Sequence, residues 1–219
     1  MRLPLVIGSV LAALPAITLA SNLTFTSEAA FDAAAGATVL ESFESLTAQV
    51  RATGTPVVTS LFTLSSPAAG LGVLNGPTSP QDGFGAFATD GVNYVSAYRP
   101  NEPLGTLTFD LTASALAFGL DLTDIEVTGS QIRISTDVGF FAGGVTLETV
   151  SANNANGSLR FFGITQDQAF SRVFLTITGT DEAVGLDSIK VAPAPVPLPA
   201  PALLLGSGLA ALGLRRRRR

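Results

Sequence analysis

Carboxylates are the side chains from which this sequence could build an acid–base site. The chain contains neither histidine nor cysteine, which removes the usual general base, the commonest metal ligand, and the Ser-His-Asp and Cys-His arrangements. Asp121, Asp124 and Glu126 form the densest acidic group, and two carboxylates at a suitable separation suffice for glycoside hydrolysis. A solvated turn after a strand explains the same cluster. We prefer that interpretation, so no catalytic residue is assigned.

Two tyrosines offer a second kind of chemistry, the stacking of sugar rings. Tyr94 and Tyr98 are four residues apart, so they share one face if residues 93–99 are extended. Arg99 lies beside them, which makes these three residues the candidate glycan-binding patch. Two tyrosines half-packed at a loop are the alternative interpretation.

Short β-strands are expected to position these side chains. Runs of alternating apolar and polar residues are separated by clusters of Gly, Asn, Asp and Ser, which is typical of an all-β antiparallel sandwich or jelly roll. The pattern does not contain the helical segments that parallel β-α-β units need. The expected strands cover residues 23–26, 38–43, 56–64, 104–111, 115–122, 131–136, 145–150, 159–164, 170–178 and 184–191.

One short helix is expected over residues 28–35, with Ser27 as its N-cap, Phe31 as its buried side chain and Gly36 at its end. Residues 65–103 are rich in Gly, Pro, Asn and Ser and are predicted to hold one or two short strands within long loops. The phenylalanines fall mostly within strand patterns and are expected in the core. In the pair Phe161-Phe162, neighbouring strand residues face opposite ways, so one of the two could be exposed.

The N-terminal residues 1–20 have the layout of a secretory signal peptide. Arg2 precedes an apolar segment, and Thr18-Leu19-Ala20 places small residues before Ser21, where cleavage is expected. A buried N-terminal strand or helix is the alternative. The β-sandwich body then covers residues 21–191, followed by a Pro/Ala linker over residues 192–195 that holds it off the membrane.

The C-terminal residues 196–219 form a membrane-stop segment. An apolar run over residues 201–214 is followed by five arginines, which stay on the cytoplasmic side. As a helix this run spans about 21 Å against roughly 30 Å of hydrocarbon, which favours temporary retention. In front of it stands a Pro-containing motif. The motif consists of Val196, Pro197, Leu198, Pro199 and Ala200, and the cap of Arg215, Arg216, Arg217, Arg218 and Arg219.

The motif, the Ala/Leu/Gly-rich helix and the terminal Arg run resemble the C-terminal sorting signal of the PEP-CTERM class, in its VPLPA variant. That resemblance implies a substrate of exosortase, a membrane enzyme of Gram-negative bacteria that make exopolysaccharide. The enzyme would cut near the motif and deliver the body to the cell surface or the medium, after the secretion machinery and signal peptidase have processed the N-terminus. An ordinary single-pass anchor is the alternative, but it would not require the motif.

The body itself resembles the lectin-like, jelly-roll β-sandwiches found in PEP-CTERM surface proteins. The likeness rests on the order SEAAFDAAAG, VLESFESL, LTFDL, ALAFGLDL, NGSLRFFGI and VGLDSIKV, a pattern of core rather than catalytic positions. Such modules often carry one structural calcium, and the resemblance places its ligands at Glu44 and Asp187. The alternative is that both are exposed residues at strand ends.

The charge of the body limits its partners. Seventeen acidic residues stand against six basic ones between residues 21 and 195, a net charge of −11, which disfavours nucleic acid and anionic membrane. The sequence therefore predicts an exported surface or matrix protein, transiently anchored with its body in the periplasm. We expect that body to be non-catalytic and to associate with exopolysaccharide. A secreted carbohydrate-active hydrolase with a carboxylate pair is the alternative function.

Overall fold

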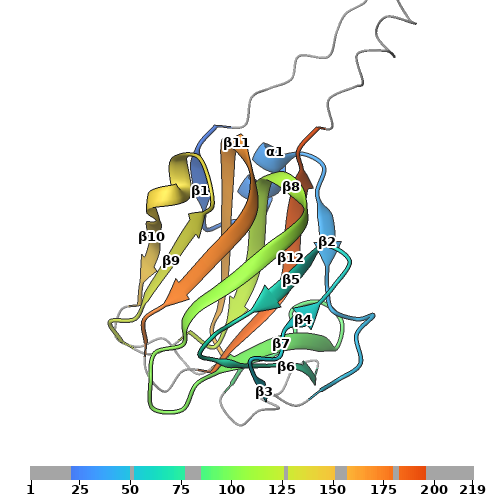
Figure 1. Cartoon of the computed structure of the whole chain (residues 1–219), viewed down its shortest axis with the longest axis vertical. Helices are drawn as coiled ribbons and strands as arrows, with labels where there is room; N and C mark the ends of the chain where they lie inside the picture. The colour runs from blue at the N-terminus through green and yellow to red at the C-terminus, as the bar shows by residue number, and fades with distance from the viewer. Residues whose placement is uncertain are drawn as a thin grey trace, which may run out of the picture.

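The computed structural model describes residues 21–49, 52–76, 85–125, 128–150, 157–179 and 183–195. The expected signal peptide, the sorting motif, the apolar run, the arginine cap and Glu126 lie outside these ranges. Within them, no helix is long and apolar enough to cross a membrane. The described chain forms an antiparallel β-sandwich (Figure 1), as the alternation of the sequence predicted.

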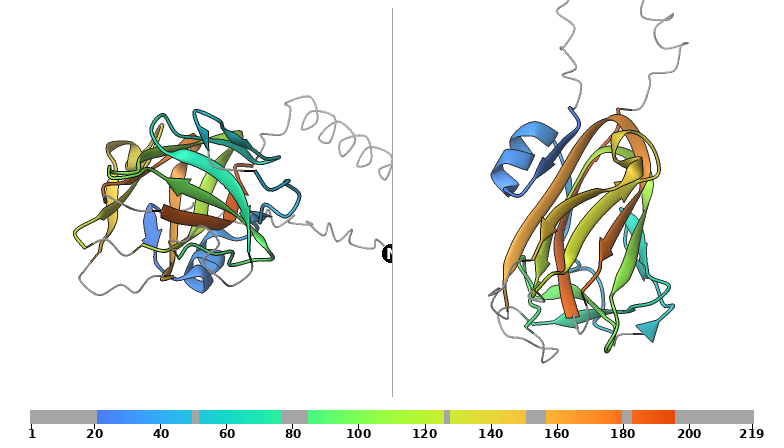
Figure 2. Two further views of the ribbon diagram at one scale, coloured as in Figure 1. Left: turned by 90° about the horizontal axis from the view of Figure 1, so that it is seen from below. Right: turned by 90° about the vertical axis from the view of Figure 1, so that its left-hand side faces the viewer.

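Two long strands, β8 (Gly105–Thr123) and β11 (Leu159–Ile177), are the frame of the sandwich. They pair with each other at both ends, from Gly105 opposite Ile177 to Thr123 opposite Leu159. Midway, the register shifts and both strands bend from one layer into the other (Figure 2, right). Hydrogen bonding is therefore continuous between the two layers of the sandwich.

The expected breaks in these two strands were wrong. The sequence predicted separate strands over residues 104–111 and 115–122, and again over 159–164 and 170–178, yet each pair is one strand. Residues 112–114 and 167–169 are exposed because they lie at the bends, on the rim of the sandwich. There the apolar alternation stops while the backbone stays extended.

Polar side chains fix these bends. Thr112 of β8 donates its hydroxyl to the carbonyl oxygens of Ser60 and Leu61, each at 3.0 Å. The carboxylate of Asp137 accepts the backbone N–H groups of Ser171 and Arg172 at 3.0 and 3.1 Å. Burial opposes the ionisation of Asp137, but these bonds and the Ser171 hydroxyl outweigh it and lower the pKa of its carboxyl.

The first layer, sheet one, uses the N-terminal half of β8 and the C-terminal half of β11. On one side β11 pairs with β9 (Gln131–Thr136), which pairs with β10 (Val145–Thr149). On the other side β8 pairs with β5 (Phe62–Ser65), which pairs with β4 (Val57–Val58). The single strand expected over residues 56–64 is thus a hairpin, because Thr59 accepts the N–H groups of Leu61 and Phe62 and turns the chain.

The second layer, sheet two, uses the other halves of the same two strands. It also contains β12 (Ala183–Pro193), which pairs with β8 along one edge and with β2 (Val39–Glu41) and β7 (Asn93–Tyr98) along the other. Beyond β7 lie β6 (Gly70–Asn75) and β3 (Ala52–Thr53), and β1 (Leu23–Phe25) pairs with β11. The last strand runs two residues past the expected end of the body. Ala192 and Pro193 pair with β8 rather than belonging to the linker.

A core of aliphatic and aromatic side chains fills the space between the layers. Phe62, Phe109 and Phe118 are fully buried and form a chain of edge-to-face contacts, with ring centroids 5.4 and 5.0 Å apart. Phe109 belongs to the half of β8 in sheet one and Phe118 to the half in sheet two. The core therefore joins the two layers across the bend of a single strand.

Helix α1 (Glu28–Ala35) covers the outer face of sheet two (Figure 2, right) and ends at Gly36, as expected. Ser27 stands at the N-cap position, but its side chain makes no capping bond. Phe31 is the buried side chain of the helix, and its ring lies 5.4 Å from that of Phe161. Both members of the pair Phe161-Phe162 are consequently buried, one under the helix and one in the core.

The contact of the helix with sheet two depends on glycine. A side chain at Gly163 would place its Cβ 2.5 Å from the ring of Phe31, so we expect Gly163→Ala to lower the free energy of unfolding by about 1–3 kcal/mol. Gly143→Ala is the matched control, because its Cβ would meet nothing within 4 Å. Urea unfolding of both variants checks this, and equal stabilities would contradict the packing described.

Candidate functional site

Buried carboxylates gather where residues 85–93 cross the outer face of sheet two. Asp121 of β8 and Asp187 of β12 are directly opposite each other in the sheet, and they are 8% and 0% exposed. Phe161 of β11 is the partner of Asp121 on its other side. Because side chains alternate between faces of a strand, both carboxylates lie on the outer face, between α1 and the crossing segment.

Asp187 holds the first part of this crossing segment. Its Oδ2 accepts the backbone N–H groups of Thr89 and Asp90 at 2.6 and 2.8 Å, together with the Thr89 hydroxyl at 3.2 Å. Its Oδ1 accepts the N–H of Ser188 at 2.7 Å. Both oxygens of this carboxylate are therefore bound to donors of the main chain.

Glu44 holds the other end of the same segment. Its Oε1 accepts the backbone N–H groups of Val92 and Asn93, each at 2.7 Å. Between these two anchor points Gly91 has a φ of +73°, and the carboxylate of Glu44 lies where its side chain would be. A residue with a Cβ would be strained there and would collide with Glu44, so glycine is required at this turn.

Burial changes the acidity of this cluster. It raises the pKa of Asp187 to about 6, against the opposing effect of the hydrogen bonds from Asp90, Ser188 and Thr89. Burial likewise raises the pKa of Asp121, where hydrogen bonds from Thr89 and Ser188 and the charge of Lys190 act in the opposite direction. Lys190 itself binds Glu28 and Asp32 of α1, each at 2.7 Å, and so fixes the helix on the same face.

The same use of carboxylates recurs elsewhere in the described chain. Glu41 accepts the N–H of Phe43 at 2.8 Å, and Asp124 accepts the N–H of Gly157 at 2.9 Å. Asp137 holds the bend of β11 in this way, as described above. The sequence alone did not indicate this role. The turn-forming run Thr89-Asp90-Gly91 was a local signal for the crossing segment, but nothing in the sequence indicated which carboxylates bind it.

The acidic cluster considered for hydrolysis has a different environment from the one expected. Asp121 and Asp124 are not residues of a solvated turn, since they are 8% and 2% exposed. They serve separate contacts, Asp121 facing Thr89 and Ser188 and Asp124 binding Gly157. The described structure thus gives each of these carboxylates a structural partner rather than a common, accessible cleft.

The proposed calcium ligands Glu44 and Asp187 meet the same crossing segment, but through N–H donors. Calcium needs six to eight oxygen ligands, and positively polarised N–H groups oppose a cation. In the part of the chain that the structure describes, no three acidic side chains form a metal-binding group. The residues present therefore do not fit the calcium site implied by the resemblance. Calcium binding remains a prediction that this geometry does not support.

The two tyrosines of the candidate glycan patch lie on β7, so the condition that their backbone is extended is met, and Arg99 directly follows the strand. Tyr98 is partly exposed, whereas Tyr94 is fully buried beside Ala86 and Ala88. Arg99 forms an ion pair with Glu102 and donates to the carbonyl of Pro103 at 3.2 Å. Tyr98 and Arg99 are partly exposed in this conformation, but the ring of Tyr94 is covered. The structure does not present the two tyrosines as one platform.

Comparison with known proteins adds little to this picture. No family model and no curated protein sequence matches the chain. Similar solved structures include two cleaved adhesin domains of Lys-gingipain. The K2 domain shows 16% identity over 72% of this chain and 99% of that domain, with a TM-score of 0.45. The K1 domain, from Porphyromonas gingivalis W83, shows 13% identity over 73% and 100%, with a TM-score of 0.41.

A third similar structure is the enzymatically active domain of tailspike protein 4 of bacteriophage CBA120. It shows 10% identity over 62% of this chain and 20% of that chain, with a TM-score of 0.32. Scores and identities this low carry no inference about function. The fold class rests on the strands described above.

The hydrogen bonds of Asp187 lead to a prediction about the crossing segment. Asp187→Ala leaves the N–H groups of Thr89 and Asp90 without their acceptor, so we expect a loss of about 1–3 kcal/mol in unfolding free energy. Amide hydrogen exchange should accelerate at Thr89 and Asp90. Asp137→Ala, which removes a comparable carboxylate at the bend of β11, should leave these two amides protected. Unchanged exchange in Asp187→Ala would show that Asp187 does not hold the segment.

The raised pKa of Asp187 also predicts a pH dependence of stability. Its pKa is about 6 in the folded protein against 3.8 in the unfolded chain, so its contribution is fully present below pH 3.8 and is lost as pH rises through 6. Relative to Asp187→Asn, the unmodified protein should therefore lose stability between pH 4 and pH 6. Urea unfolding in EDTA across this range measures the difference, and a pH-independent difference would contradict the raised pKa.

Proposed function

We propose that the chain is an exported, surface-delivered protein whose β-sandwich body is non-catalytic and associates with extracellular polysaccharide. Exosortase would recognise the sorting signal over residues 196–219 and cut the chain near it. Before processing, the body would stand in the periplasm, tethered to the inner membrane. After processing, it would reside at the cell surface or in the medium.

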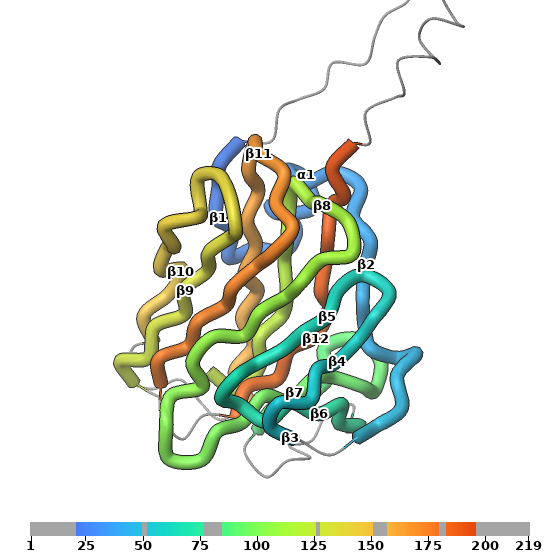
Figure 3. The backbone as a smooth tube through the Cα atoms, in the orientation of Figure 1, coloured from blue at the N-terminus to red at the C-terminus, as the bar shows by residue number. Residues whose placement is uncertain are grey.

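One observation about the body carries this proposal. The first and the last described residues of the body lie on the same side of the sandwich, beside the bends of the two long strands (Figures 1 and 3). The carbonyl of Ser21 accepts the hydroxyl of Thr165, at 2.5 Å, and the N–H of Ala194 donates to Ser114 at 2.8 Å. A tether that continues from Pro195 would thus hold the body by this end and leave β6, β7 and the far loops pointing away from the membrane.

The use of the carboxylates supports the non-catalytic part of the proposal. The acidic residues best suited to acid–base work are buried and bound to the main chain, where they position loops. Polysaccharide association agrees with the other side of the molecule, where a sheet face rich in hydroxyl-bearing and charged side chains lies opposite the face that α1 covers.

The sorting step can be tested in the native host by intact-mass analysis of inner-membrane, surface and medium fractions. We expect protein outside the inner membrane to lack residues 1–20 and everything from about Val196 onward. Replacing Pro197 and Pro199 by Ala should leave full-length tails in the inner membrane, because the recognition motif is altered. Pro195→Ala, just outside the motif, is the control and should be processed normally. A surface form that retains Arg219 would refute the sorting proposal.

A further inference from the structure

The outer face of sheet one is a polar surface with a regular arrangement. Side chains that face outward form rows across the strands, because the registers of β9, β11, β8 and β5 are aligned. The first row consists of Thr146, Arg133, Thr176 and Thr106, and the second of Ser135, Phe174, Thr108 and Ser65. The side chains that alternate with them, such as Ile134, Leu175 and Phe109, are buried in the core.

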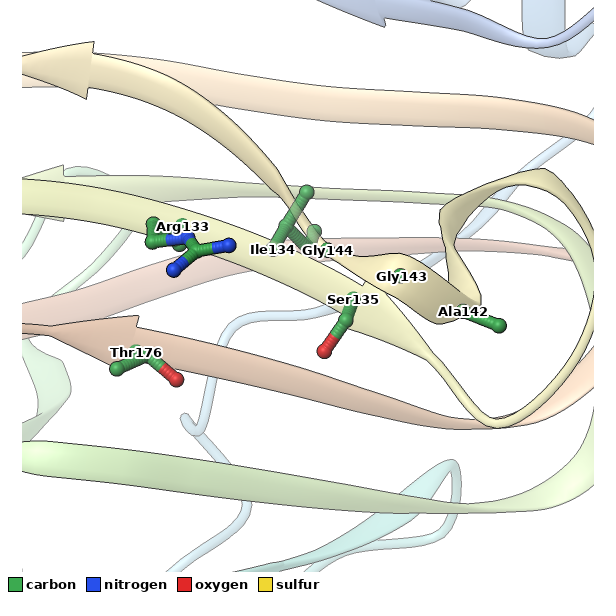
Figure 4. Close-up of a pocket in the computed structure, with 7 residues that line it drawn as sticks. All are labelled: Arg133, Ile134, Ser135, Ala142, Gly143, Gly144 and Thr176. Carbon is green, nitrogen blue, oxygen red and sulfur yellow. The ribbon is translucent and has the colours of Figure 1, made fainter.

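A pocket of about 220 Å³ opens at one end of these rows. Figure 4 shows Arg133 and Ser135 on β9 and Thr176 on the neighbouring strand β11, with the chain after the short 3-10 helix η1 (Phe140–Gly143) beside them. The pocket is lined by Arg133, Ile134, Ser135, Ala142, Gly143, Gly144 and Thr176. It is smaller than the roughly 300 Å³ at which sites for drug-sized ligands begin, so it suits a single sugar unit or its substituent.

Arg133 is the unusual charge in this pocket. Every other basic side chain in the described ranges has a carboxylate within ion-pair distance: Arg99, Arg160, Arg172 and Lys190. Arg133 has none there, although the body carries a net charge of −11. Gly144 approaches its guanidinium closely, since a Cβ on that residue would lie 3.4 Å from Nη2. An exposed guanidinium beside hydroxyl groups presents a fork of N–H donors that matches a carboxylate.

An aromatic ring lies in the row next to this pocket. Phe174 is directly opposite Ser135 in the sheet and is only partly buried, unlike the fully buried rings of the core. Its other neighbour in the row is Thr108. A partly exposed ring surrounded by hydroxyl groups offers an apolar surface to the face of a sugar, while the hydroxyls can bind the hydroxyl groups of that sugar.

We propose that this face binds a sugar unit that carries a carboxylate, as a uronic acid does. The guanidinium of Arg133 binds the carboxylate, Ser135 and Thr176 bind sugar hydroxyls, and the ring of Phe174 lies against the sugar. The inference rests on the proposed association with polysaccharide and specifies the ligand and the residues. We choose an acidic sugar because of charge complementarity. No carboxylate lines the pocket beside the guanidinium of Arg133, and the buried carboxylates of Asp121 and Asp187 lie on the outer face of the opposite sheet.

The test compares two probes with the same sugar rings, trigalacturonic acid and its methyl ester, in which methyl groups remove the charge of the carboxylates. Binding to the processed protein from the native host is measured by calorimetry in 0.15 M salt, a concentration at which long-range repulsion from the acidic body is screened beyond about 8 Å. We expect the acid to bind more tightly than the ester. Arg133→Gln should weaken binding of the acid about 10-fold or more, the range of a charge-assisted hydrogen bond, and leave the ester nearly unaffected.

A matched control lies on the same face. Arg172 is bound to Asp110 at 2.5 Å and lies outside the pocket, so Arg172→Gln should change the affinity for the acid less than about 3-fold. Phe174→Leu should weaken both probes, because both present the same sugar face. Thermal melts identify any variant that has lost its fold, and Arg133→Lys, which keeps the charge, then takes the place of Arg133→Gln. It should bind the acid more weakly because the planar fork is lost.

Three results would overturn the inference. They are equal binding of the acid and the ester, equal losses in Arg133→Gln and Arg172→Gln, and displacement of the acid by inorganic phosphate with no effect of Phe174→Leu, which would reduce the pocket to a simple anion site.

Sedimentation with the host's own polysaccharide separates this inference from the proposed function. If the unmodified protein and Arg133→Gln bind that polysaccharide equally, association stands and this site is wrong. If neither binds it while trigalacturonic acid binds at Arg133, the site stands and the polysaccharide association fails.

Discussion

The structure depends on one constraint, the pairing of two long strands that bend together through both layers of the sandwich. Because β8 and β11 remain hydrogen-bonded on both sides of their bends, neither sheet can move relative to the other without breaking this ladder. The aromatic chain from Phe62 to Phe118 packs inside the same bends. The other strands extend from this pair towards the edges. The sandwich therefore has a continuous backbone connection where many β-sandwiches have only side-chain packing between their sheets.

The acidic composition of the body has a structural explanation in the described residues. Carboxylates accept backbone N–H groups at a strand end, at a strand bend and along a crossing segment, as Glu41, Asp137 and Asp187 illustrate. Irregular segments lack the ladder partners that strands provide, and buried N–H groups without acceptors are costly. A chain with long connections and few basic residues can satisfy these donors with carboxylates. The negative charge is thus partly a consequence of how the loops are held.

This use of charge separates the two faces of the molecule. The outer face of sheet two carries α1, the crossing segment and buried carboxylates, and it is largely covered by the protein itself. The outer face of sheet one carries hydroxyl groups, a partly exposed ring and an arginine without a carboxylate partner among the described residues. With both ends of the body leaving together (Figure 1), a tethered molecule would keep the face of sheet one accessible along its length. The proposals about delivery and ligand binding are therefore compatible with each other in space.

The sequence by itself determined the class of fold, helix α1 and most strand positions, because alternation and turn residues act over a few neighbouring positions. It could not determine that residues 105–123 form one strand, since exposed residues at a bend look like a turn until the second sheet is in place. It singled out Tyr94 but could not determine that this ring lies on a strand where Ala86 and Ala88 cover it. It singled out Glu44 and Asp187, while only the tertiary structure brought residues 89–93 between them.

Arg133 and Phe174 are ordinary strand residues in sequence, and only the register between β9 and β11 makes them neighbours. Local chemistry is encoded along the chain, whereas partners distant in sequence are fixed by strand pairing and burial.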